Sequence, residues 1–178
     1  MPTLQVDSLS FNFKANVSAE IYDLWMHYTS VWNAPPASQK AVDVVAVEVP
    51  ESTTWLIEAK DFRVLTNPPK PSNLGGLHQS VADKVAHTLA GLADASVNAA
   101  SPAEKAHATD ALAAATRRVV LHLEPYAGAD SNLSILFPKI FAANVLLKLR
   151  QLVKSIDANP LILNIATTPA SGVPWTVS

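Results

Sequence analysis

Residues 41–60 read AVDVVAVEVPESTTWLIEAK, two apolar runs rich in β-branched side chains on either side of a segment containing Pro50 and Ser52. Valine, threonine, isoleucine and tryptophan favour extended backbone, whereas proline and serine between two such runs are typical of turns. The stretch therefore predicts a β-hairpin, with strands over residues 41–49 and 54–59.

Upstream of this hairpin, the sequence predicts one strand and one helix. Leu9, Phe11 and Phe13 alternate with polar residues, which is the period of a half-buried strand. Ser18 is a suitable N-cap, and the apolar residues after it are three or four apart, as in an amphipathic helix. We therefore expect a helix over residues 19–29 and a proline-containing loop at 33–36.

Downstream, helices and strands alternate. Apolar residues from Leu77 to Leu92 recur mostly every four positions and predict a long helix, reached by a rigid connection over residues 67–71. Ser101-Pro102-Ala103-Glu104 combines a capping box with proline at the first helical position, which predicts a helix ending near Thr116. The later segments are predicted to be a strand over residues 119–123, a helix opening at Pro138, a strand over 161–165, and a tail or edge cover over 167–178.

The length and this order of elements predict a single α/β domain over residues 1–178. A chain of 178 residues fits one domain, and 49% hydrophobic residues suffice for a sizeable core. Because helices and strands alternate late in the chain, we expect a mixed β-sheet flanked by helices.

Composition and charge exclude several classes of protein. The chain has no cysteine, which excludes disulfide scaffolds and cysteine-rich zinc sites. Its five histidines lack the HExxH spacing of a metalloprotease, and it contains neither a GxSxG nor a GxxxxGK[ST] motif. The net charge of −2 gives no overall basic excess for binding phosphates. The N-terminus does not look like a signal peptide, and Lys139 and Lys148 interrupt the longest apolar region, so we expect a soluble cytoplasmic protein that does not enter the membrane.

Three residues of the hairpin form the candidate active site. Glu58 and Lys60 are two apart on one strand and therefore share a face, and Asp43 on the partner strand can lie beside them. Two carboxylates can hold Mg²⁺ through hard oxygen ligands, and the metal can activate a bound water. A neighbouring lysine can orient that water or stabilise developing negative charge.

This arrangement, Lys40-Ala41-Val42-Asp43 followed by Trp55-Leu56-Ile57-Glu58-Ala59-Lys60, resembles the PD-(D/E)xK nuclease superfamily with its restriction-endonuclease-like fold. The resemblance covers a nuclease-like core of about residues 18–92, and residues 93–166 then add further helices and strands. Val42 stands where many members have proline.

The resemblance implies a metal-dependent nuclease that acts on nucleic acid, DNA more than RNA. Asp43 and Glu58 would bind Mg²⁺ or Mn²⁺, and Lys60 would be the catalytic lysine. Glu20 would be an additional acidic residue from the preceding helix, and Gln79 a polar group near the substrate.

Alternative interpretations remain for each of these residues. Glu58 and Lys60 can be a solvated ion pair on an ordinary hairpin, with Asp43 a strand-start residue that has no partner. Glu20 can simply favour a helix N-terminus. Gln79 belongs to a polar helix stripe with Asp83 and His87. The alternative function is a non-catalytic binding or assembly module of the same fold, with a protein partner or as a homo-oligomer.

Overall fold

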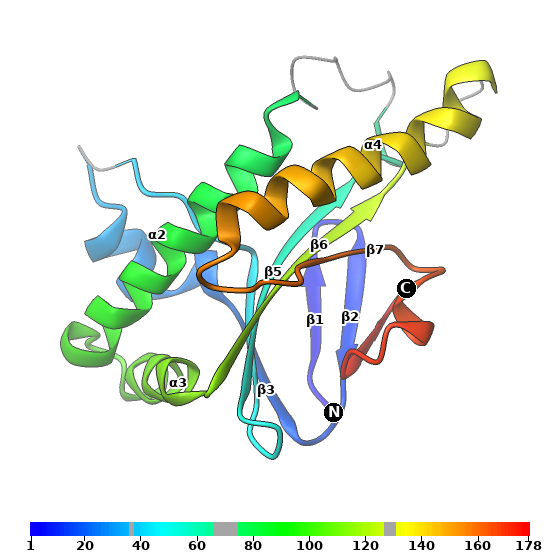
Figure 1. Cartoon of the computed structure of the whole chain (residues 1–178). Coiled ribbons are helices and arrows are strands. Elements are labelled where there is room, and N and C mark those ends of the chain that lie inside the picture. Colours follow the sequence, from blue (N-terminus) through cyan, green and yellow to red (C-terminus); the bar gives the residue numbers. More distant parts are fainter. Residues whose placement is uncertain (36–37, 66–74, 127–130) are drawn as a thin grey trace.

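A computed structural model describes residues 1–35, 38–65, 75–126 and 131–178, with the side chains of 131–140 excepted. The predicted connection over residues 67–71 and part of the predicted loop at 33–36 lie outside this description. The described chain is one α/β domain in three layers: helices, a mixed five-stranded sheet and a small second sheet (Figure 1).

The central sheet is built around the predicted hairpin. Its strands lie in the order β3-β4-β5-β6-β7. Neighbours are antiparallel from β3 to β5 and parallel from β5 to β7. The hairpin prediction is confirmed, because Val44 pairs with Ile57 and Ala46 with Trp55. The strands are β3 (Val17–Ile21), β4 (Val44–Glu48), β5 (Thr53–Asp61), β6 (Thr116–Glu124) and β7 (Leu161–Leu163).

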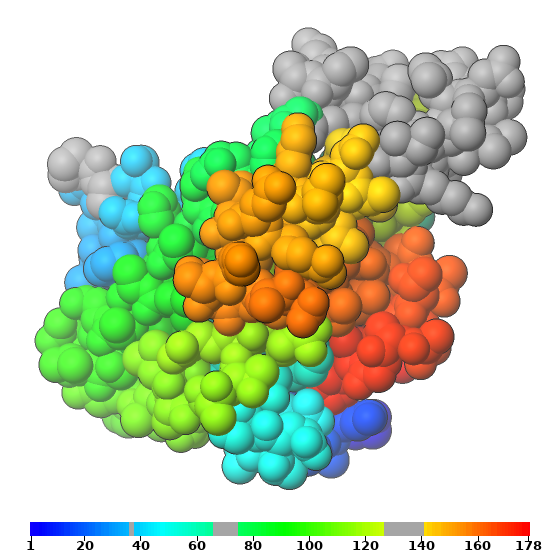
Figure 2. Space-filling view, in the orientation of Figure 1, coloured from blue at the N-terminus to red at the C-terminus, as the bar shows by residue number. Residues whose placement is uncertain are grey.

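Helices cover one face of this sheet. The apolar stripe that begins at Leu77 forms α2 (Leu77–Asn98), as predicted. With α3 (Pro102–Ala113) and α4 (Ser131–Val153) it encloses a core that includes Val45, Leu56 and Leu121 of the sheet. Figure 2 shows the outer surface that these helices form on the near side of the molecule.

A three-stranded sheet covers the opposite face, in the order β1-β2-β8. Phe11, Phe13 and Trp175 fill the space between the two sheets together with Ile57 and Ala59. The predicted strand at Leu9 is therefore confirmed, whereas the end of the predicted tail is a strand that pairs with β2. The elements are β1 (Thr3–Val6), β2 (Leu9–Phe13) and β8 (Trp175–Val177), the last preceded by the 3-10 turn η3 (Thr168–Ala170).

The helix predicted over residues 19–29 is wrong. Residues Val17–Ile21 form strand β3, followed by the 3-10 turn η1 (Tyr22–Leu24) and the short π-helical segment η2 (Tyr28–Trp32). The competing signal is a period of two, because Val17 and Ala19 point into the core between the sheets while Ser18 and Glu20 are exposed. Pairing with β4 provides backbone hydrogen bonds along one side of this strand, and Leu24 of the expected helix stripe is 71% exposed.

The other helix boundaries differ in smaller ways. Ser101 caps α3 by accepting a hydrogen bond from the Glu104 backbone N–H, as predicted, but α3 ends at Ala113 because Thr116 already pairs with Thr53 in the sheet. Helix α4 begins at Ser131, so Pro138 lies inside it. The prediction placed Pro138 at the helix start because a proline inside a helix removes one backbone donor and crowds the carbonyl four residues earlier, so this boundary is wrong. Among the described residues, we find no helix with the length and apolarity that a membrane crossing requires.

Candidate active site

The hairpin brings Asp43 beside Glu58 at one end of the central sheet. Asp43 directly precedes β4, one step beyond the pair formed by Val44 and Ile57. Its carboxylate oxygen Oδ2 accepts a 2.7 Å hydrogen bond from the Ala59 backbone N–H. Its carbonyl accepts another from the Tyr22 N–H, at 2.9 Å. Asp43 is therefore fixed through both its side chain and its backbone, and its second carboxylate oxygen, Oδ1, faces Lys84.

Helix α2 fixes the chain that leads into Asp43. The Val42 N–H donates to the hydroxyl of Thr88 at 3.0 Å, and the Lys40 N–H donates to Nδ1 of His87 at 3.0 Å. Thr88 is fully buried, so this bond is protected from water. The segment before β4 thus takes its position from the helix as well as from the sheet.

Glu58 is a buried carboxylate held by two lysines. Its side chain lies on the helix-covered face of β5 and is 1% exposed. The Lys60 ammonium nitrogen lies 2.7 Å from Oε1, and the Lys84 ammonium nitrogen lies 2.8 Å from both Oε1 and Oε2. The same Lys84 nitrogen lies 3.7 Å from Oδ1 of Asp43. Lys84, on α2, therefore joins the two carboxylates.

The electrostatics of Glu58 reflect burial and crowding by like charge. Burial, and then the Asp43 carboxylate, raise the pKa of Glu58, while the Lys60 and Lys84 ammoniums oppose this. Burial alone would lower the pKa of Lys60, but its contact with Glu58 outweighs burial, so the pKa is raised. Lys60 therefore stays charged, and the two lysines are the groups that compensate a carboxylate in a buried position.

A third carboxylate, Asp23 of η1, belongs to the same surroundings. It is half-buried, and its pKa is raised by burial and then by the charge of Asp43, whereas Lys84 lowers it. The sequence interpretation missed both Asp23 and Lys84. A usable signal existed for Lys84, because it follows Val81 by three positions and precedes Thr88 by four, which places a charge on the buried face of α2.

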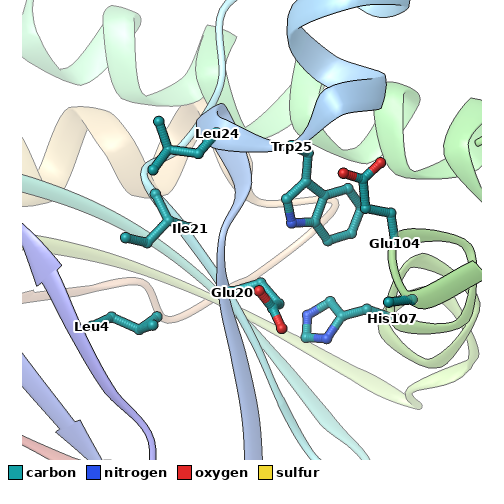
Figure 3. Close-up of a pocket in the computed structure, with 8 residues that line it drawn as sticks. Leu4, Glu20, Ile21, Leu24, Trp25, Glu104 and His107 are labelled. Atoms are coloured by element: carbon teal, nitrogen blue, oxygen red, sulfur yellow. The ribbon is translucent and has the colours of Figure 1, made fainter. Parts of the chain in front are cut away.

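The structure does not bring Glu20 or Gln79 into contact with this cluster. Gln79 is exposed and donates its side-chain N–H to Asp83 at 2.8 Å, as the polar-stripe alternative expects. Glu20 lies on β3 instead of a helix and lines a pocket of ≈ 370 Å³. In Figure 3 its carboxylate lies between Leu4 and the ring of His107, nearer to the ring.

Lys84, Asp43 and Glu58 define the chemical character of the site. Among the described residues, no group of three or more histidine, aspartate and glutamate side chains has an arrangement that could hold a metal ion. The two carboxylates nevertheless share one cation, the Lys84 ammonium, so the pair already forms a binding position for positive charge. Oxygen-only donors of this kind suit hard cations rather than zinc.

Comparisons with known proteins give one partial match. The chain is 29% identical, over 214 aligned positions, to a cysteine–tRNA ligase of Neisseria meningitidis serogroup A / serotype 4A (strain DSM 15465 / Z2491). The alignment covers all of this chain but only 30% of that protein's length. No family model matches the chain, and no solved structure matches it.

Proposed function

We propose that this chain is a Mg²⁺- or Mn²⁺-dependent phosphodiester hydrolase of nuclease type, with a restriction-endonuclease-like core. The observation that carries the proposal is the convergence of Asp43, Glu58, Lys60 and Lys84 at the end of β5. The chain order also supports it, since the antiparallel strands β3, β4 and β5 are followed by helices α2 and α3 and then by β6, which is parallel to β5.

The residues present fit a hydrated Mg²⁺ ion once the Lys84 ammonium moves aside. Oδ1 of Asp43 and the carboxylate of Glu58 would hold the ion, with water in its remaining positions. When bound, Mg²⁺ would lower the pKa of a coordinated water and offset charge on the scissile phosphate. Lys60 stays on Glu58 at the rim of the site, 35% exposed, where its ammonium can orient the attacking water or stabilise the charge that develops on phosphate.

Nucleic acid is the substrate class that this chemistry favours, with DNA expected ahead of RNA. The chain's net charge of −2 provides little general attraction, so binding would depend on the local charge of the lysines and the metal. The partial relative is named a tRNA ligase, which is a reason to test RNA alongside DNA.

A non-catalytic binding or assembly module, with a protein partner or as a homo-oligomer, is the second candidate. The observation that favours it is that Lys84 already satisfies both oxygens of Glu58, as in a purely structural ion network. In that case the carboxylates would hold α2 onto the sheet, and no metal would bind.

A cleavage assay with a matched lysine control separates the two. Linear, circular and single-stranded DNA, and RNA, are incubated with Mg²⁺ or Mn²⁺ and wild type, Lys60→Ala or Lys154→Ala. Lys154 is exposed and lies just beyond α4, so its loss controls for general charge. We expect metal-dependent cutting that falls about 100-fold or more in Lys60→Ala and persists in Lys154→Ala. If folded wild type does not cut, or if both variants cut equally, the nuclease proposal is refuted and the non-catalytic module becomes the better candidate.

A further inference from the structure

The proposed function does not explain why the Lys84 ammonium lies between the two carboxylates. Lys84 extends from α2, and its nitrogen contacts Oε1 and Oε2 of Glu58 equally, at 2.8 Å. It also lies 3.7 Å from Oδ1 of Asp43. The backbone N–H of Ala59 donates to the other oxygen of the Asp43 carboxylate, Oδ2. The Lys84 ammonium thus lies between Oδ1 of Asp43 and the carboxylate of Glu58.

From this geometry we propose that Lys84 is a built-in counter-ion, which fills the cation position between Asp43 and Glu58 and is exchanged for a divalent metal ion. The inference rests on the proposed function, because it concerns how that metal would enter. A divalent ion about 2 Å from these oxygens would use the lone pairs to which Lys84 now donates. The Lys84 ammonium and a divalent ion cannot occupy this one position between the two carboxylates at the same time, because they would overlap and repel each other.

The two lysines differ in ways that assign the exchange to Lys84. Lys60 contacts one oxygen of Glu58 and projects from the same strand, so it can remain while the other oxygen binds a metal. Lys84 covers both oxygens and belongs to a different element. Its side chain is 20% exposed, so rotation about its flexible stem can carry the ammonium toward solvent.

Charge balance explains why the chain would keep such a residue. Glu58 is almost wholly buried, and the nearby Asp43 carboxylate further disfavours its charged form. Without a cation the pair would repel and distort the end of β5. Lys60 and Lys84 together match the two negative charges, which keeps the metal-free site assembled and ready for the ion.

The test measures metal binding and stability rather than cleavage. Mn²⁺ affinity is determined by isothermal titration calorimetry for wild type, Lys84→Met, Lys84→Arg and the exposed control Lys154→Met. Methionine keeps the length of the side chain without its charge, so we expect Lys84→Met to bind Mn²⁺ about 10- to 100-fold more tightly than wild type, because a charged hydrogen-bonding competitor is gone. Arginine still competes, so Lys84→Arg should bind no more tightly than wild type.

Thermal unfolding gives a second readout. Without metal, Lys84→Met should melt at a lower temperature than wild type. Saturating Mn²⁺ should raise the melting temperature of Lys84→Met by more than it raises that of wild type. Lys84→Gln replaces it if the methionine variant does not fold.

Each other outcome counts against the proposal in a distinguishable way. If wild type binds Mn²⁺ and Lys84→Met binds it equally or more weakly, the exchange is refuted while the metal site stands. If no variant binds Mn²⁺, both the exchange and the metal-dependent function are refuted.

Discussion

Replacing Thr88 with valine tests whether α2 positions the candidate site. Thr88 is fully buried, and its hydroxyl accepts the hydrogen bond from the Val42 N–H at 3.0 Å, one residue before Asp43. Valine has nearly the same shape but no acceptor, so the variant leaves a buried N–H without its partner. Such a loss costs about 1–3 kcal/mol of unfolding free energy.

Thr88→Ser is the matched control, because serine keeps the hydroxyl and removes one methyl group. That deletion costs about 1 kcal/mol. Urea unfolding followed by tryptophan fluorescence and circular dichroism gives both free energies. We expect Thr88→Val to be the less stable variant and, if the chain is a nuclease, the less active one, because Asp43 loses its support. Equal stability of the two variants, or a more stable valine variant, would show that the hydroxyl does not anchor this segment.

Three further predictions concern packing and pH. Gly91→Ala should destabilise the protein, because the new methyl would collide with the buried Tyr22 hydroxyl and lie 2.9 Å from Nε1 of Trp32. This overpacking costs about 1–3 kcal/mol, against a helix-propensity gain of about 1 kcal/mol. Chemical denaturation measures the difference, with Gly76→Ala as the control because Gly76 has open space around it. Hydrogen bonds from Arg63 hold the pKa of Asp61 well below its usual range. The stabilising contribution of Asp61 is therefore complete above about pH 4 and is lost as the pH falls further. Asp61→Asn should flatten the pH dependence of the unfolding free energy between about pH 2 and 5. Burial lowers the pKa of His107, so as the pH falls the unfolded chain takes up a proton near pH 6.5 before the folded chain does. Stability should therefore fall as the pH drops from about 7 to 5. His107→Gln should weaken that fall, and an unchanged dependence of unfolding free energy on pH would show that His107 is not its cause.

The hairpin was predictable because its signals are local and agree with one another. β-branched runs, a turn segment and the two-residue period all indicate the same pairing, so Glu58 and Lys60 could be placed on one face from the sequence alone. Asp43 followed from the hairpin register. The capping box at Ser101 likewise places a helix start without any tertiary information.

The prediction for the segment before the hairpin was wrong because pairing with another strand decides its structure. Residues 17–21 carry a weak two-residue period, and the adjoining apolar residues carry a weak helical one. Pairing of β3 with β4 decides between them, and that choice depends on a partner strand about 27 residues away. The same misassignment directed attention to Glu20, whereas the actual neighbour of Asp43 is Asp23, two residues beyond the end of β3.

Lys84 could have been found by following the requirements of Glu58. A glutamate on the sheet face that packs against helices cannot remain charged there without a cation, and one neighbouring lysine at the rim leaves a second oxygen unsatisfied. The compensating charge must then come from the covering helix, and Lys84 is the residue of α2 that interrupts its buried face. A charge at an apolar helix position and a carboxylate at an apolar strand position thus predict each other.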